Sequence, residues 1–186
     1  ILMKKADPRV DITIIERNPE GVTWGWGVVF SDETLENFQE ADAPTYERIT
    51  HTFARWEAID VIFGGRTIRS GGHAFYGIRR MRLLEILMNR AAELGVRLNF
   101  GTEAADLSVF SDSDLIVAAD GVNSRIRSDR AEHFKPEIVV GRSPYTWLAT
   151  RKLFSAFTFI VRENSHGVFQ VHAYPFDDAT STFIVE

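Results

Sequence analysis

The stretch DLIVAADGVNSRIR, residues 114–127, decides how we interpret the fold. Its first part is apolar throughout, which predicts a strand over 114–120 that is buried on both faces of a sheet. The strand ends in Asp120-Gly121, and a short helix is predicted from Asn123. Gly121 would let the backbone approach a ligand closely, and the start of the helix would present free N–H groups to a phosphate. An ordinary Asp-Gly turn between a strand and a helix is the alternative.

The spacing beyond this turn makes the pattern more specific. Ser124 and Arg127 follow Asp120 at fixed offsets and complete the pattern D-G-x-x-S-x-x-R. Arg127 adds a positive charge that can bind a phosphate. Asp120 would repel a phosphate, so its natural partner is a sugar hydroxyl. The sequence therefore indicates a nucleotide site at this turn.

A second strand–acid combination lies near the start of the chain, in DITIIERN, residues 11–18. An apolar strand runs straight into Glu16-Arg17, and an acid at the end of such a strand takes ribose hydroxyls in nucleotide-binding α/β folds. That role needs a glycine-rich turn about 20 residues earlier, and no glycine precedes Asp11. Since the chain opens on Ile1 and closes in strand-like sequence, we expect a fragment. A charge pair facing water is the alternative.

A third candidate is Arg80, in GIRRMRLLEIL. An apolar stripe at helical spacing predicts a helix over 79–94. Arg80 lies in its first turn, where the helix dipole disfavours an arginine and a bound phosphate would offset that cost. Arg69 could join Arg79, Arg80 and Arg82 in a basic cluster; a solvated helix face is the alternative, and we prefer it for Arg82.

The other elements follow from the same periodicities. They are a loop over 17–31 with a GWG segment that could cover a flat ring, helices from Ser31 and over 45–56, a hairpin over 59–70, a strand over 96–100 and an antiparallel sheet after Val139. The sequence thus predicts an α/β domain followed by an aromatic-rich antiparallel sheet.

Composition excludes several classes of protein. The net charge is −5, from 21 basic and 26 acidic residues, and no basic run suggests nucleic-acid binding. No apolar run is long enough for a membrane span. The absence of cysteine excludes disulfides and thiolate zinc sites and fits the cytoplasm. The scattered histidines are poor evidence for a metal site, so we predict none.

TIIERN, R-x-x-L-L from Arg80 and DGVNSRIR together resemble the class A flavoprotein monooxygenases, the para-hydroxybenzoate hydroxylase-like group. GWGVVFSDETLENF, GRTIRSGGHAFYGIRRMRLLEIL, FKPE and AFTF resemble, more narrowly, the members that act on salicylyl-CoA or 2-aminobenzoyl-CoA. The resemblance implies a glutathione-reductase-type Rossmann-like FAD domain, here 1–138, with the hairpin 59–70 belonging to either side. An antiparallel substrate domain, 139–186, would follow. Both would be truncated.

The resemblance also implies roles for single residues. Glu16 would take the adenosine ribose hydroxyls, Arg17 would lie by the adenine, and Arg80 would hold the FAD phosphate or ribityl region. Asp120 and Gly121 would contact the cofactor, and Arg127 would support that site.

The activity implied is aromatic-ring hydroxylation with FAD, NADH or NADPH, and O2, through a C4a-hydroperoxyflavin. The ring would belong to a small molecule such as a CoA thioester. No catalytic base is assigned, and His172 is considered only because a strand residue could point into the pocket. Two alternatives stay open: a flavin-dependent reductase or dehydrogenase on the same fold, and a non-catalytic nucleotide-binding module.

Overall fold

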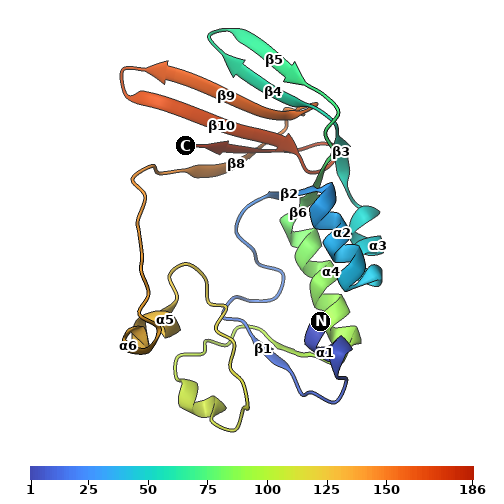
Figure 1. Ribbon diagram of the computed structural model, residues 1–186, viewed down its shortest axis with the longest axis vertical. Helices are drawn as coiled ribbons and strands as arrows, with labels where there is room; N and C mark the ends of the chain where they lie inside the picture. The colour runs from blue at the N-terminus through green and yellow to red at the C-terminus, as the bar shows by residue number, and fades with distance from the viewer.

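The computed structural model describes residues 1–186. Figure 1 shows a large sheet at one end of the molecule, helices below it on one side, and short strands and helices at the other end. No helix of the chain is long and apolar enough to cross a membrane.

The large sheet has six strands in the order β5-β4-β9-β10-β11-β8. The strands are β4 (Ile59–Phe63), β5 (Arg66–Ser70), β8 (Thr146–Thr150), β9 (Phe157–Asn164), β10 (Gly167–Pro175) and β11 (Ser181–Val185). The predicted hairpin and the C-terminal antiparallel strands are confirmed. The hairpin joins that sheet because β4 pairs with β9, and this one pairing is parallel. The sheet is therefore mixed.

A three-stranded sheet, β2-β6-β3, connects this sheet to the helices. Its strands are β2 (Gly27–Ser31), β3 (Ala54–Trp56) and β6 (Phe75–Arg79). Two predictions fail here: the loop over 17–31 contains the whole of β2, and the helix over 45–56 stops at Thr50. Trp56 lies outside the helix because it belongs to β3, which pairs with β6. Its indole stacks with Phe75 and with Tyr174, at ring centroid distances of 6.1 Å and 6.0 Å.

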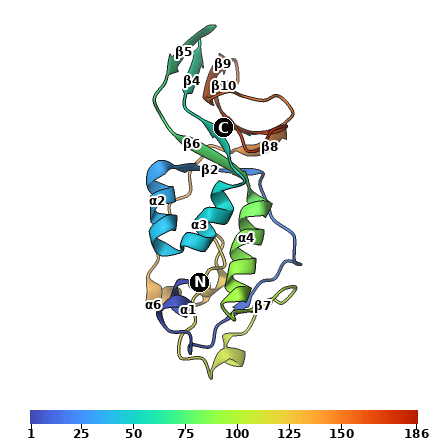
Figure 2. The ribbon, with the colours of Figure 1, turned by 90° about the vertical axis from the view of Figure 1, so that its right-hand side faces the viewer.

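Three helices cover the connecting sheet, and Figure 2 shows them below the large sheet. They are α2 (Asp32–Ala41), α3 (Ala43–Thr50) and α4 (Arg80–Glu93), while the short α1 (Leu2–Ala6) lies near the far end of α4. The helices predicted from Ser31 and over 79–94 are confirmed. Their apolar faces and the connecting sheet bury one core cluster, which consists of Phe30, Leu35, Ile49, Ile78 and Ile86.

A charged network ties α1, α3 and α4 together around Asp42. Asp42 caps α3 by accepting hydrogen bonds from Thr45 N and Thr45 Oγ1 at 3.2 Å and 2.7 Å. The Arg90 guanidinium donates two more, at 2.8 Å and 3.0 Å, and Lys5 Nζ lies 3.1 Å from Oδ1. These hydrogen bonds, that from Arg90 foremost, hold the pKa of Asp42 well below its usual range.

The opposite end of the molecule contains a two-stranded parallel pair, β1 (Thr13–Ile15) with β7 (Arg97–Asn99). The predicted strand over 114–120 is wrong, since these residues form no strand and all are exposed. A strand requires a neighbour whose backbone completes its hydrogen bonds, and β1 and β7 pair only with each other. The helix predicted after Asn123 forms as α5 (Arg125–Asp129), between η1 (Leu107–Phe110) and α6 (Ala131–Phe134) in chain order.

Candidate functional site

Glu16 follows β1 directly and keeps one carboxylate oxygen free. Its backbone N–H donates to Asn99 O at 2.8 Å, which extends the pairing of β1 with β7 by one residue. Oε1 accepts from the backbone and side-chain nitrogens of Asn18, both at 2.7 Å. Oε2 makes no hydrogen bond within the chain and remains available as an acceptor. Arg17 beside it is exposed.

The turn before α5 holds Asp120 and Gly121. Asp120 Oδ2 accepts from Ile126 N at 3.3 Å, and a hydrogen bond from Ser124 is the main reason that the pKa of Asp120 is lowered. The carboxylate therefore faces the start of α5. Gly121 has φ 86°, and no atom lies within 4 Å of the place a Cβ would take. The backbone at Gly121 is open to a ligand.

Arg127 folds back onto the same turn. Its Nη2 donates to Val122 O at 2.5 Å, and its backbone N–H donates to Ser124 Oγ at 3.0 Å. Its Nε is buried without an acceptor in the chain. Since an unpaired buried N–H costs about 1–3 kcal/mol, an acceptor that bonded to this Nε would stabilise the turn.

Arg80 begins α4 and holds the loop that precedes β2. Its backbone N–H donates to Trp26 O at 2.8 Å, and its Nε donates to Thr23 Oγ1 at 3.0 Å. The two terminal nitrogens make no hydrogen bond or ion pair within the chain. The basic cluster proposed from the sequence does not form as one group, because Arg69 pairs with Asp60, Arg79 with Asp177 and Arg82 with Glu85.

The loop held by Arg80 contacts the large sheet through glycines. A Cβ at Gly25, where φ is 91°, would lie 2.7 Å from the Trp147 ring on β8. Gly27 N donates to Thr182 Oγ1 at 3.1 Å, and Tyr174 donates from its hydroxyl to Gly27 O at 2.9 Å. The tryptophans beside Gly25 stay exposed, at 77% for Trp24 and 50% for Trp26. Two indoles are thus presented at the joint between the sheets.

The predicted residues fall into groups at two levels of the molecule. Glu16 lies near the β1 end and the 120–127 turn near α5, whereas Arg80 lies at the start of α4 beside β2 and β6 (Figure 1). No hydrogen bond or ion pair joins these groups. The chain leaves three groups free here: one Glu16 carboxylate oxygen, the terminal nitrogens of Arg80 and the open backbone at Gly121. These are groups that can bind ribose hydroxyls and phosphates.

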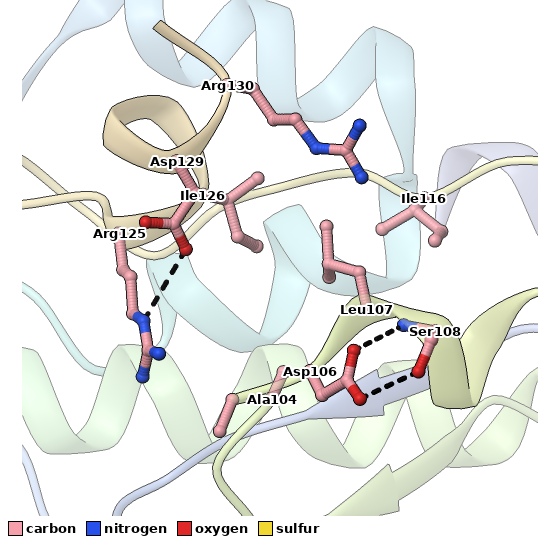
Figure 3. A pocket seen from close by; sticks show the side chains of 10 residues that line it. Ala104, Asp106, Leu107, Ser108, Ile116, Arg125, Ile126, Asp129 and Arg130 are labelled. Atoms are coloured by element: carbon pink, nitrogen blue, oxygen red, sulfur yellow. Dashed lines mark hydrogen bonds and ion pairs between the residues drawn. The ribbon is translucent and has the colours of Figure 1, made fainter.

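A hollow of about 380 Å³ lies next to the 120–127 turn, and Figure 3 shows it from close by. It lies between the segment 104–108 and α5. Arg125 is engaged by Asp129 at 3.5 Å, and Asp106 accepts from Ser108. None of the six predicted cofactor-binding residues lines this hollow, so we give it no part in the site.

Comparisons of sequence give the family. No protein-family model matches the chain. Over 185 residues, all of this chain, it is 38% identical to salicyloyl-CoA 5-hydroxylase of a Streptomyces species. The chain is related to class A flavoprotein monooxygenases. It is also 32% identical over 176 residues to a Streptosporangium sibiricum monooxygenase named for an anthranilyl group on an aryl-carrier protein. The chain spans 36% and 49% of the length of these two monooxygenases.

Solved structures of monooxygenases share the fold. The chain superposes on a 2-methyl-3-hydroxypyridine-5-carboxylic acid oxygenase with a TM-score of 0.69 at 16% identity, covering 99% of this chain and 53% of that one. A probable FAD-dependent monooxygenase from Pseudomonas aeruginosa gives 0.66 at 14%, covering 99% and 55%. The predicted α/β class is therefore confirmed as a mixed α/β fold of the kind found in these monooxygenases.

Sequence reasoning missed Trp147 as a site candidate. Its indole packs against Gly25, and its Nε1 is buried without a partner. Only two signals could have drawn attention to it: an aromatic residue in an expected substrate sheet, and a glycine between two tryptophans elsewhere in the chain. Nothing in the sequence connects positions 25 and 147.

Proposed function

We propose that this chain belongs to an enzyme that hydroxylates an aromatic ring with FAD, NADH or NADPH, and O2. The substrate is an aromatic acyl thioester such as salicyloyl-CoA or 2-aminobenzoyl-CoA. The observation that carries the proposal is the similarity to a salicyloyl-CoA hydroxylase over the entire chain, through both the helical part and the large sheet. A relative named for an aryl-carrier substrate supports a thioester.

The cofactor-binding residues of the proposal are Glu16, Arg17, Arg80, Asp120, Gly121 and Arg127. Free groups support the assignment at Glu16 Oε2 and at the terminal nitrogens of Arg80, and open space supports it at Gly121. Asp120 and Arg127 shape the turn through Ser124 and Val122. In this arrangement Glu16 binds ribose hydroxyls, Arg80 neutralises phosphate charge, and the 120–127 turn fixes the backbone that faces the cofactor.

The chain divides, in this proposal, into part of a glutathione-reductase-type FAD domain over 1–138 and part of a substrate domain over 139–186. The hairpin 59–70 belongs with the substrate domain. The parallel pairing of β4 with β9 supports that assignment. The parallel pairing of β1 with β7 supports the Rossmann-like half, because βαβ units give parallel strands.

FAD, when bound, supplies the reduction of O2 and the transfer of one oxygen atom to the ring. The residues of this chain bind and orient the reactants and keep water away. Hydrogen bonds fix both ends of the Thr23–Gly27 loop, from Arg80 to Thr23 at one end and between Gly27 and both Thr182 and Tyr174 at the other. The exposed tryptophans lie between these two ends. Such fixed positions lower the entropy cost of bringing the reactants together.

The test uses the full-length protein. We expect purified protein to show flavin absorbance, and its oxidation of NADH or NADPH to speed up when salicyloyl-CoA or 2-aminobenzoyl-CoA is added. Under 18O2, one labelled oxygen atom should appear in the aromatic product. Pyridine nucleotide oxidation with no label in the product would overturn hydroxylation and favour a reductase.

Glu16→Ala should weaken FAD retention by about ten- to a hundredfold, because a hydrogen bond to a charged group contributes about 1.5–3 kcal/mol. The measurement is the FAD dissociation constant, obtained by adding FAD to the apoprotein and following flavin fluorescence. Glu20→Ala is the matched control, since Glu20 is an exposed acid of the same loop. Equal affinities in wild type and Glu16→Ala would contradict the ribose assignment.

A further inference from the structure

One row of side chains crosses all six strands of the large sheet. Residues that face each other in register share a face of a sheet. The strand register gives a single continuous row from β5 to β8, which consists of Ile68, Val61, Phe159, His172, Ile184 and Trp147. His172 is the only member of this row that can ionise.

The row lies on the face that meets the Thr23–Gly27 loop. Trp147, at one end of the row, packs on Gly25. Tyr174 lies two residues from His172 on the same strand, hence on the same face, and bonds to Gly27. Two residues of strand span about 7 Å. The row therefore borders the loop that presents the exposed tryptophans, and Trp56 stacks on Tyr174 farther along the same face.

His172 presents one free hydrogen-bond donor on this aromatic face. Phe159 contacts its ring edge-on at a centroid distance of 5.0 Å. Gln170 Nε2 lies 2.9 Å from His172 Nε2. An amide nitrogen only donates, so His172 Nε2 accepts, and the neutral ring carries its proton on Nδ1. Nδ1 makes no hydrogen bond in the chain, and on this half-buried side chain it is not fully enclosed.

We propose that His172 is a specificity-determining residue that donates a hydrogen bond from Nδ1 to a hydroxyl oxygen on the substrate ring. The aromatic substrate lies against Phe159 and Trp147, which offer flat apolar surface, while His172 offers the polar contact of the row. Gln170 fixes the tautomer. The inference rests on the proposed function. It adds that this face of the sheet selects substrates with a hydroxyl group on the ring.

The experiment compares salicyloyl-CoA with benzoyl-CoA, which differ only in the ring hydroxyl. Each is titrated without NADH or NADPH into full-length, FAD-loaded protein, and binding is followed by the change in flavin absorbance. Wild type should bind salicyloyl-CoA about tenfold more tightly, which is the size of one hydrogen bond. His172→Leu should lose this preference, while His172→Gln, which keeps a donor, should retain part of it.

His166→Leu is the control, because His166 is an exposed histidine at the turn that leads into the same strand. Its preference should equal that of wild type. A tenfold preference that survives in His172→Leu overturns the inference and leaves the proposed function standing. Equal weakening of both thioesters in His172→Leu also overturns it, since the hydroxyl is then not the partner. Wild-type protein that binds neither thioester overturns the proposed substrate class and the inference together.

Discussion

Asp42→Ala is expected to lower the free energy of unfolding by about 3–5 kcal/mol, which is the usual effect of removing one partner from a buried ion pair. The Asp42 side chain is 4% exposed and that of Arg90 is 17% exposed. The substitution leaves the Arg90 guanidinium partly buried without its main partner. It also removes the cap of α3, which by itself contributes about 1 kcal/mol. Urea denaturation followed by circular dichroism measures the loss.

Asp7→Ala is the control for this prediction, because Asp7 pairs with an arginine, Arg9, that is 91% exposed, and exposed pairs contribute little. The pH dependence gives a second check. A carboxyl whose pKa is lowered on folding stabilises the protein above its unfolded pKa, here 3.8, and loses that effect as the pH falls. The difference between wild type and Asp42→Ala should therefore shrink below about pH 4. A difference under about 1 kcal/mol at pH 7 would contradict the role of the network.

Gly77→Ala should be the most damaging small substitution at the joint between the two sheets. A Cβ at Gly77 would lie 2.2 Å from the Pro175 carbonyl oxygen and 3.0 Å from the Trp56 ring. The first of these is a backbone atom of β10 and cannot turn away. We expect a loss of about 3 kcal/mol in unfolding free energy, at the upper end of the usual cost of overpacking.

Gly71→Ala is the matched comparison, since no atom lies within 4 Å of a Cβ there. It should change stability by less than about 0.5 kcal/mol, as surface substitutions generally do. Thermal unfolding of both variants gives the comparison. If Gly77→Ala unfolds like Gly71→Ala, β6 and β10 do not approach each other as closely as described.

Local sequence was sufficient for elements whose stabilising contacts are close in the chain. The apolar stripe of α4, the Ser31 side chain that accepts from Thr34 at the start of α2, and the Gly64-Gly65 turn each involve residues within a few positions of one another. Helix periodicity and turn chemistry encode such elements directly. The C-terminal strands also followed from composition, because alternating aromatic and β-branched residues favour a sheet.

For the candidate site, sequence identified residues but not their surroundings. Glu16 was selected as an acid at a strand end, and the structure adds that one of its oxygens is occupied by Asn18 while the other is free. Arg80 was selected for its place in a first turn, and the structure adds its hold on Thr23. Asp120 was selected as a partner for a sugar hydroxyl, and the structure adds that one of its oxygens accepts from Ile126 N at the start of α5.

The sequence by itself determined the helices from Ser31 and over 79–94, the hairpin, the candidate residues and the family resemblance, because each depends on spacing within a short segment. Only the tertiary structure decided that 114–120 forms no strand, that β2 and β6 do, and that Gly25 and Gly77 face Trp147 and Pro175. The physical reason is the same in each case. Strand hydrogen bonds and close packing need a partner that lies tens of residues away, and local sequence does not specify which distant segment will supply it.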